Sequence, residues 1–396
     1  MIEKALHGSR KYWIWLAFLG VFILIGFLCY LHQWKIGLGV TGMSRDVSWG
    51  FYIANFTFLV GVAAGAVMIV LPYYWHNYKV YGKITVLGEF LAIAAVMMCL
   101  LFIFVDLGQP MRAMNVLRYP TPHSVFFFDA CVLNGYLLLN LICGWTVLHS
   151  YYKGTKYPSW LKPIIYIAIL WAPSIHIVTA FIYQGLPGRE FWLTAIMAPR
   201  FLASAFCAGP AFIIVAALLL KKVANFDPGK QAIDSLAKTV AYAFIANLLM
   251  FFFEVFTAFY SNIPGHKAPL KYLFVGLNGH SEWVPFMWAG AIMAAIAIIL
   301  LVIPKTRKNE ATLTIACICV FFACWIDKGI GLLVGGYTPT PFDTITPYVP
   351  TLPEIGIVLG VWAVGFFVLT ILYKIFLGVY RSKELVVKYN GVLYKK

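Results

Sequence analysis

Apolar residues form long uninterrupted runs along the whole chain, and polar residues gather in short stretches between them. An α-helix needs about 20 apolar residues to cross the hydrocarbon core of a bilayer. A window of that length finds ten runs, at residues 12–32, 50–75, 84–106, 124–148, 161–184, 200–220, 236–260, 283–303, 312–335 and 354–379. The pattern predicts an all-α polytopic membrane protein with ten transmembrane helices.

The composition agrees with this prediction. Hydrophobic residues make up 62% of the chain and charged residues 11%, and the mean hydropathy is +0.84. A soluble domain does not have this composition, so we expect one integral membrane domain over residues 1–396. The first run follows Lys4, Arg10 and Lys11. It is too long for the apolar core of a signal peptide and has no small-residue cleavage site, so we expect a retained helix.

The basic residues predict the orientation. Twenty of the 30 Lys and Arg residues lie at the termini and in the loops after even-numbered helices, and eight lie in the loops after odd-numbered helices. Basic residues concentrate on the cytoplasmic side. We therefore expect a multi-pass protein of the cytoplasmic (inner) cell membrane, with both termini and a tail over residues 380–396 in the cytoplasm. The net charge of +15 then reflects topology and not nucleic-acid binding.

A weak internal repeat suggests two units. The helices at 50–75 and 200–220 both begin with aromatic residues followed by closely spaced small residues. Asp106 in the next helix of the first unit matches Glu254 in the second, and His176 matches Asp327. The spacing predicts two four-helix bundles in parallel orientation, helices 2–5 (50–184) and helices 6–9 (200–335), flanked by the first and last helices.

Ionisable residues inside the bilayer cost several kcal/mol each, so they mark functional sites. Most of them fall in the outer half of their helices, namely Asp106, Asp129, His176, Glu254, Asp327 and Lys328. Glu89 lies near the inner face. Plainer interpretations stay open: the two aspartates of the first unit can be helix-end residues, Lys328 can neutralise its neighbour, and His176 can bind a carbonyl between helices.

The same inventory limits the cofactors. A membrane haem needs two histidines on facing helices, and only His176 lies well inside a predicted helix. None of the eight cysteines forms a C-x-x-C pair, and no metal-ligand spacing occurs. We therefore expect no haem, iron–sulfur cluster or metal in this chain. A quinone fits better, because it needs an apolar cleft, a hydrogen-bonding group and a titratable group such as histidine.

Three segments carry a resemblance to a known family: SWGFYIANFTFLVGVAAGA, VDLGQPMR and PGREFWLTAIMAPRFLASAFCAG. They resemble the NrfD (polysulfide reductase membrane subunit) family across helices 2 to 9. The chain is most similar to the DsrP-type subunit of the DsrMKJOP transmembrane complex of sulfate reducers. The HybB-type and alternative-complex-III-type members are alternatives.

The resemblance implies a haem-free subunit that binds menaquinone, or another quinone, in the first bundle near the outer face. Mapped here, the family's quinone site falls on Tyr52, Asn55, Asp106, Arg112 and His176. Some members have a histidine on helix 2, which this chain lacks. The family also docks on a ferredoxin-like iron–sulfur subunit, often with a multihaem cytochrome c and further redox subunits in a complex of sulfur metabolism.

Local spacing adds to the mapped site. Thr179 and Tyr183 follow His176 at i+3 and i+7, so they share its helix face. Gly108 and Pro110 end the helix after Asp106, which predicts that Arg112 folds back as its counter-charge.

The positions of the charged residues within their predicted helices and loops suggest roles for two further groups of residues. We expect proton transfer through the remaining intramembrane groups, which are Glu89, Asp129, Glu254, Asp327 and Lys328. We expect the iron–sulfur partner to dock on the outer loops, which include Trp49, Arg112, Arg189 and Arg200.

Together these features predict a quinone-reactive membrane subunit of a respiratory redox complex that acts in electron transport, with proton translocation as an option. Such a subunit is not a stand-alone enzyme. Two other classes stay open. An ion-coupled transporter suits the repeats and buried acids, although the polar centres lie off the midplane and helices 2 to 9 lack an obvious broken pair. A passive anchor for redox partners is the second.

The orientation is directly testable. A reporter that is active only in the cytoplasm, fused after Lys396, should be active because the basic loops hold both termini inside. The same reporter inserted at Gly188, in a loop with few basic residues, is the control and should be inactive. Activity at Gly188 with none at Lys396 would overturn the depth assignments.

Overall fold

The computed structural model describes residues 1–340, 342 and 344–389. Residues 390–396 of the predicted tail lie outside the described part. The first ten residues of that tail continue the last helix, which runs from Leu352 to Tyr389. The described residues are almost entirely helical and contain no β-strand.

All ten predicted spans are present and long and apolar enough to cross a membrane. They are α1 (Arg10–Ile36), α2 (Phe51–Gly65) continued by α3 (Val67–Tyr74), α4 (Thr85–Asp106), α6 (Val125–Lys153), α7 (Leu161–Gln184), α8 (Met197–Ala224), α9 (Lys230–Tyr260), α11 (Val284–Val302), α13 (Glu310–Cys324) continued by a π-helix (Trp325–Gly331) and α14 (Leu332–Gly336), and α15 (Leu352–Tyr389). The chain is therefore a multi-pass membrane protein, as predicted.

The connections add three short helices that the hydropathy pattern does not show. They are α5 (Asn115–Arg118), α10 (Pro264–Phe274) and α12 (Pro304–Arg307). Short 3-10 turns cover Ile2–Ala5, Leu38–Val40, Lys79–Lys83, Pro110–Arg112 and Glu190–Trp192. These elements are too short or too polar to span a bilayer, so they leave the count of ten unchanged.

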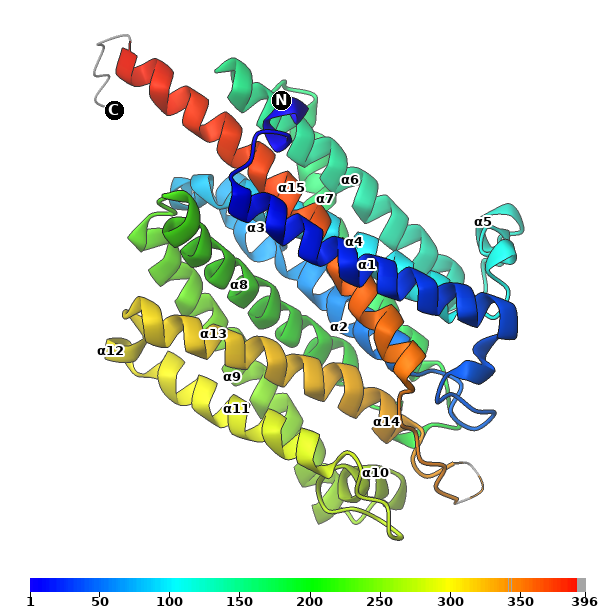
Figure 1. Ribbon diagram of the computed structural model, residues 1–396. Coiled ribbons are helices and arrows are strands. Elements are labelled where there is room, and N and C mark those ends of the chain that lie inside the picture. The colour runs from blue at the N-terminus through cyan, green and yellow to red at the C-terminus, as the bar shows by residue number, and fades with distance from the viewer. Residues whose placement is uncertain (341, 343, 390–396) are drawn as a thin grey trace.

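The spans pack as two groups of four (Figure 1). In the first group α2 contacts α4 and α7, and α6 contacts the same two helices. In the second group α8 contacts α9 and α13, and α11 contacts the same two helices. α2 also packs on α8, which joins the groups, while α15 lies on α4 and carries α1 on its outer side. The repeat relation between the groups stays a prediction.

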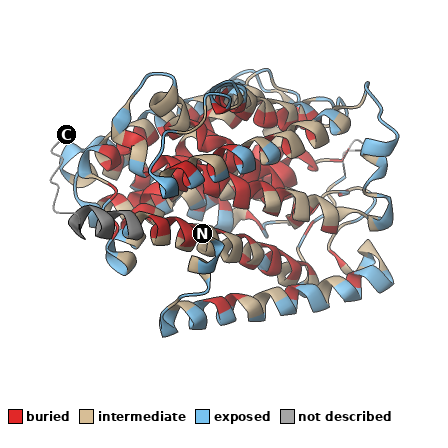
Figure 2. Ribbon diagram, turned by 90° about the horizontal axis from the view of Figure 1, so that it is seen from above, coloured by how far each residue is buried: buried red, intermediate tan, exposed pale blue. Residues whose placement is uncertain are grey.

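Buried residues concentrate in the middle of the bundle (Figure 2). α2 is the most enclosed span, whereas most residues of α1, α6, α9 and α11 face outward. The small residues of α2 allow this central position. A Cβ atom added to Gly65 would lie 2.5 Å from the Ala205 carbonyl oxygen and 2.8 Å from the Gly209 Cα. Close backbone approach through small residues drives helix association in membranes.

The two ends of the bundle differ in charge. The connections 37–50, 107–124, 185–196, 261–283, 337–340 and 344–351 lie at one end, which we call the low-charge end because these connections carry six of the 30 Lys and Arg residues. Figure 1 shows α5, α10 and α14 at this end, opposite the N-terminus. We call the other end the basic end.

Two spans depart locally from a regular α-helix but stay continuous. In the second span a turn at Ala66, which keeps α-helical dihedral angles, separates α2 from α3, and the ninth span contains the seven-residue π-helix. The π-helix packs against α2. π-helical turns are rare and occur often at functional sites. The expectation that helices 2 to 9 lack a broken pair stays a prediction, because neither span is interrupted.

A buried acid that the sequence survey missed caps α2. Glu354 is fully buried, and its carboxylate accepts hydrogen bonds from the backbone N–H groups of Phe51 (2.9 Å) and Gly42 (3.0 Å). Tyr348 donates a hydrogen bond to the same carboxylate. The pKa of Tyr348 is raised, mainly by burial and to a smaller extent by the nearby Glu354 carboxylate. Thr351 and Glu354 also form the T-x-x-E pattern of a capping box at the start of their own helix, α15. The sequence therefore does contain a signal for this acid.

The α2–α8 crossing predicts a stability effect. Gly65→Ala places a methyl group against two backbone atoms of α8, which can yield only by moving a helix, so we expect a loss of about 1–3 kcal/mol. The control is Gly20→Ala in α1, where an added Cβ meets no atom within 4 Å. Thermal unfolding of the two purified variants decides the point. Equal melting temperatures would contradict the packing described here.

Candidate functional site

The polar centre of the molecule is a contact between His176 and Lys328. His176 lies on α7 and is 0% exposed, and its Nε2 is hydrogen-bonded to the Nζ of Lys328, which projects from the π-helix. The Lys328 Nζ also lies 3.5 Å from the carbonyl oxygen of Phe201 on α8 and 4.3 Å from the centre of its ring. Three helices from both groups therefore meet at one amine.

Glycine makes room for this pair. A Cβ atom added to Gly61 on α2 would lie 3.0 Å from the Lys328 Nζ and 3.3 Å from the His176 ring. Any side chain at this position would have to displace the pair, which is enclosed by protein. The ring of Phe201 lies against His176 with its centroid 5.1 Å away. Together the four residues form a tightly packed polar centre.

The other ring nitrogen of His176 is unsatisfied. Its Nδ1 is buried and makes no hydrogen bond to any residue in the described part of the chain. If Lys328 donates to Nε2, a neutral imidazole carries its proton on Nδ1 as an unpaired donor, and in the opposite arrangement Nδ1 is an unpaired acceptor. Leaving such a group buried and unpaired costs about 1–3 kcal/mol. A ligand oxygen that pairs with Nδ1 would recover this free energy.

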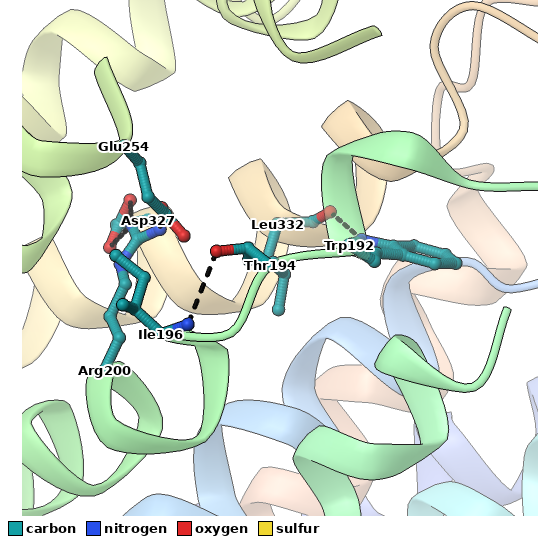
Figure 3. Close-up of polar contacts among 7 residues, drawn as sticks. All are labelled: Trp192, Thr194, Ile196, Arg200, Glu254, Asp327 and Leu332. Carbon is teal, nitrogen blue, oxygen red and sulfur yellow. Dashed lines mark hydrogen bonds and ion pairs between the residues drawn. The ribbon is translucent and has the colours of Figure 1, made fainter. Parts of the chain in front are cut away.

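A second polar cluster surrounds Arg200 (Figure 3). Its guanidinium group is ion-paired with Glu254 on α9 and binds both oxygens of Asp327, at 2.7 and 2.8 Å. The side chain of Arg200 is only 12% exposed. The charge of Arg200 is therefore paired inside the bundle, and its predicted role in docking stays a prediction.

The π-helix separates the roles of Asp327 and Lys328. Asp327 turns toward Arg200, and Lys328 turns toward His176. The interpretation that Lys328 simply neutralises its neighbour is thus not supported, since each residue has a partner on a different helix. Arg200 was missed as the partner because the ion-paired residues lie on three helices that are far apart in the sequence.

The predicted face of α7 points inward. Thr179 and Tyr183 are buried together with His176. Thr179 lies 2.9 Å from an Asp129 carboxylate oxygen and 2.7 Å from the Ile175 carbonyl oxygen, and Tyr183 shares a hydrogen bond with Thr57 on α2. These hydroxyl groups already have protein partners. They hold α7 against α6 and α2, and they position His176.

The two helix-2 residues predicted for the site are also satisfied. Tyr52 donates to the Gln33 side chain on α1 (2.7 Å). The Asn55 carbonyl oxygen accepts from the indoles of Trp325 (3.0 Å) and Trp362 (2.9 Å), and its amide donates to the Phe51 carbonyl oxygen (2.7 Å). Both side chains join α2 to its neighbours through these hydrogen bonds. They therefore have few free donor or acceptor groups left for a ligand.

Asp106 and Arg112 do not pair, contrary to the prediction that Arg112 folds back. Arg112 is exposed on the loop, and Asp106 is half-buried at the last residue of α4. One carboxylate oxygen of Asp106 is buried without a hydrogen bond to any described residue. Arg112 is the last residue of the 3-10 turn Pro110–Arg112. Asp106 thus has unused hydrogen-bonding capacity at the low-charge end.

The predicted proton-transfer residues do not form one connected chain among the described residues. Glu254 and Asp327 share Arg200, Asp129 binds Thr179, and Lys328 binds His176. Glu89 lies apart on α4, 2% exposed, with both carboxylate oxygens unpaired within the described part of the chain. The structure therefore presents four separate polar centres.

The remaining predicted docking residues lie at the low-charge end but are partly covered. Trp49 stacks on Trp192 at 5.8 Å and meets the ring edge of Tyr183 at 5.6 Å. Arg189 donates to the Asp46 carbonyl oxygen at 3.0 Å and lies 4.5 Å above the ring of Tyr337. Both residues join the connections of the two groups. No cluster of three metal-ligating side chains occurs in the described part of the chain.

The Arg200 cluster predicts a large stability effect. Arg200→Met removes one positive charge from between two largely buried carboxylates, so we expect a loss of about 3–5 kcal/mol. The triple variant R200M/E254Q/D327N should recover most of that loss because no buried charge stays unpaired. Thermal unfolding in detergent measures both. The account would be contradicted if R200M melted at the parent temperature, or if the triple variant were no more stable than R200M.

Comparison with known proteins places the chain in a family. The family model described as polysulphide reductase, NrfD, matches residues 39–339. A Halobacterium salinarum protein that is named for the membrane component of a dimethyl sulfoxide reductase is 24% identical over 392 residues, covering 89% of this chain and 88% of that protein.

Two further relatives match over most of their length. The Hdr-like menaquinol oxidoreductase integral membrane subunit of Archaeoglobus fulgidus is 24% identical, covering 94% of this chain and 95% of that protein. The menaquinone reductase integral membrane subunit of Nitratidesulfovibrio vulgaris is 22% identical, covering 92% and 91%. The family model spans most of the chain and includes every polar centre described above except the Glu354 cap, so this protein belongs to the NrfD family.

Proposed function

We propose that this chain is the quinone-reactive integral membrane subunit of a multi-subunit respiratory complex, and that it exchanges electrons between menaquinone and an iron–sulfur partner. One observation carries the proposal: His176 is fully buried, is held by Lys328 through one nitrogen and has its other nitrogen unpaired. A buried histidine with one free nitrogen is suited to bind and titrate a ligand oxygen.

The names of the relatives support the choice of ligand. Two relatives that cover nearly the whole chain are named for menaquinol oxidation and menaquinone reduction. A quinone needs a hydrogen-bond donor at its carbonyl oxygen, and a quinol needs an acceptor at its hydroxyl group. The Nδ1 of His176 can serve either state, because exchange of the Lys328–His176 hydrogen-bond direction changes Nδ1 from donor to acceptor.

The described residues fit such a group and divide the work. When bound, menaquinone supplies the capacity to carry two electrons and two protons. His176 binds the ring oxygen through Nδ1 and holds its proton there. Lys328 fixes the imidazole orientation through Nε2. Thr179 and Tyr183 hold α7 in place, and Asp106, with a free carboxylate oxygen at the low-charge end, exchanges the proton with water.

Proton translocation is a further part of this proposal. Because the polar centres are separate, transfer across the bundle needs at least one of them to change partner. We assign the proton transfer between centres to the Lys328 amine. It contacts His176, and Lys328 is next in the sequence to Asp327 of the Arg200 cluster. Glu89 would serve the basic end, where both of its carboxylate oxygens are free.

The partner and the orientation are also proposals. We place a ferredoxin-like iron–sulfur subunit on the low-charge end, with a cytochrome c or other redox subunits beyond it. His176 lies eight residues from the end of α7 at Gln184, or roughly 12 Å from that end. A partner there would have a short distance for electron transfer. The excess of basic residues at the other end supports placing that end in the cytoplasm.

The two rival classes predict different behaviour. A carrier of the inverted-repeat kind has broken helices at corresponding positions of its halves. Here the two irregular spans stay continuous, and they are the second and the ninth, the first helix of one group and the last of the other. A passive anchor gives no reason for an unpaired buried histidine. The redox subunit is therefore the better-supported class.

The test is replacement of His176 by Phe, which keeps the ring volume and removes both nitrogens. The complex should assemble, while quinol-dependent turnover falls by about 10²- to 10⁴-fold, the range for loss of a positioned proton carrier. Electron transfer among the partner subunits from an artificial donor should persist. His149→Phe, an exposed histidine on α6, is the control. Quinol turnover at the parent rate in H176F would remove His176 from the site.

A further inference from the structure

A cleft lies in the second group, and none of its lining residues belongs to the predicted quinone site. It lies between α9 and α11 and against the π-helix, with a volume of ≈290 Å³. Its walls are mainly apolar, with Phe244, Leu248 and Phe251 on one side and Ala291 and Ala294 on the other. A smaller cavity adjoins it and reaches Arg200, Glu254 and Lys328. Binding sites for small molecules begin at about this volume and are similarly apolar.

One polar side chain is aimed into the cleft without a partner. Asn247 of α9 lines both cavities and is 4% exposed. Its amide oxygen makes no hydrogen bond to any residue that the structure describes. The oxygen and nitrogen of an amide side chain can exchange places by rotation, and either orientation leaves a polar atom of Asn247 facing the cleft. Burying such an atom unpaired costs about 1–3 kcal/mol, so the site favours a ligand that can hydrogen-bond to it.

Depth limits what that ligand can be. Asn247 is 17 residues from the start of α9 and 13 from its end, or about 25 and 20 Å along the helix. It therefore lies near the middle of a hydrocarbon core that is about 30 Å thick. The hydrogen-bonding groups of phospholipids stay in the headgroup layer, roughly 15 Å away. An acyl chain could fill the cleft but could not satisfy Asn247.

We propose that this cleft is a second binding site for a quinone-class ring, with Asn247 hydrogen-bonding a ring oxygen and Phe244 and Phe251 enclosing the ring. A quinone dissolves in the hydrocarbon layer and carries polar oxygens on a flat apolar ring, which matches one amide among aromatic walls. The site lies between α9 and α11, whose residues face mostly outward. The choice of ligand class rests on the proposed function, whereas the location rests on the cavity and Asn247.

The cleft also lies beside the Arg200 cluster. Asp327 lines both cavities, and Arg200 and Glu254 line the smaller one. A ring bound at Asn247 would thus lie next to three charged groups that already satisfy one another. Asn247 is the unpaired polar group of this wall, so it alone determines how the ring oxygen is held.

The experiment uses the full-length chain in phospholipid nanodiscs and an azido-substituted menaquinone analogue as a photoaffinity probe, with labelled peptides identified by mass spectrometry. We expect labelling of α9 and α11 around residues 244–251 and 287–295, and its loss on competition with unlabelled menaquinone. Asn247→Leu removes the polar group, and Ala294→Phe fills the cleft. Each should reduce labelling of the cleft by about tenfold, the effect of roughly 1.4 kcal/mol.

The matched control is Ala289→Phe on the outward face of the same helix, α11, and outside the cleft, which should leave labelling unchanged. Labelling of α7 near His176 reports the first site in the same samples. Labelling of the cleft without labelling of α7 would contradict the proposed function of His176 and would still support the second site. Parent-level cleft labelling in N247L, or labelling that a phospholipid probe displaces and menaquinone does not, would overturn the second site.

Discussion

The packing of the two four-helix groups around the polar centre depends on one buried amine, that of Lys328. Lys328 is only 5% exposed, so its hydrogen-bonding groups must find partners inside the protein. It finds them in His176 on α7 and in the backbone of α8 at Phe201. Because Lys328 belongs to the ninth span, this amine fixes the ninth span against helices of both four-helix groups. The glycine at position 61 on α2 is what leaves space for it.

Other features follow from that requirement. A regular α-helix turns successive residues by about 100°, whereas the π-helical turn at Trp325–Gly331 shifts this register. Asp327 then reaches Arg200 while Lys328 reaches His176, so two adjacent charges enter different clusters. The same segment approaches α2 closely, since a Cβ atom added to Gly329 would lie 2.9 Å from the Ala54 carbonyl oxygen. Small residues on α2 and in the π-helix therefore serve the polar centre as well as the packing.

The ten spans, most of their bounds and the inward face of His176, Thr179 and Tyr183 could be predicted, because hydropathy and helical periodicity are local properties. The start of α9 and the end of α15 lie six and ten residues beyond the predicted bounds. The partners of the charged residues could not. Arg200, Glu254 and Asp327 lie on three separate helices, and their meeting depends on tertiary packing. The π-helical turn at Trp325–Gly331 has no local signal. The predicted pairing of Asp106 with Arg112 does not form, and Arg112 is exposed on the loop.

The central claim is that His176 and Lys328 act as one unit, and a double-mutant cycle tests it most directly. The variants are H176F, K328M and the double variant, each measured for thermal unfolding and for quinol turnover. The account predicts strong coupling, of about 1–3 kcal/mol in stability, with the double variant turning over no more slowly than the slower single variant. Independent effects, so that the losses simply add in both measurements, would contradict it.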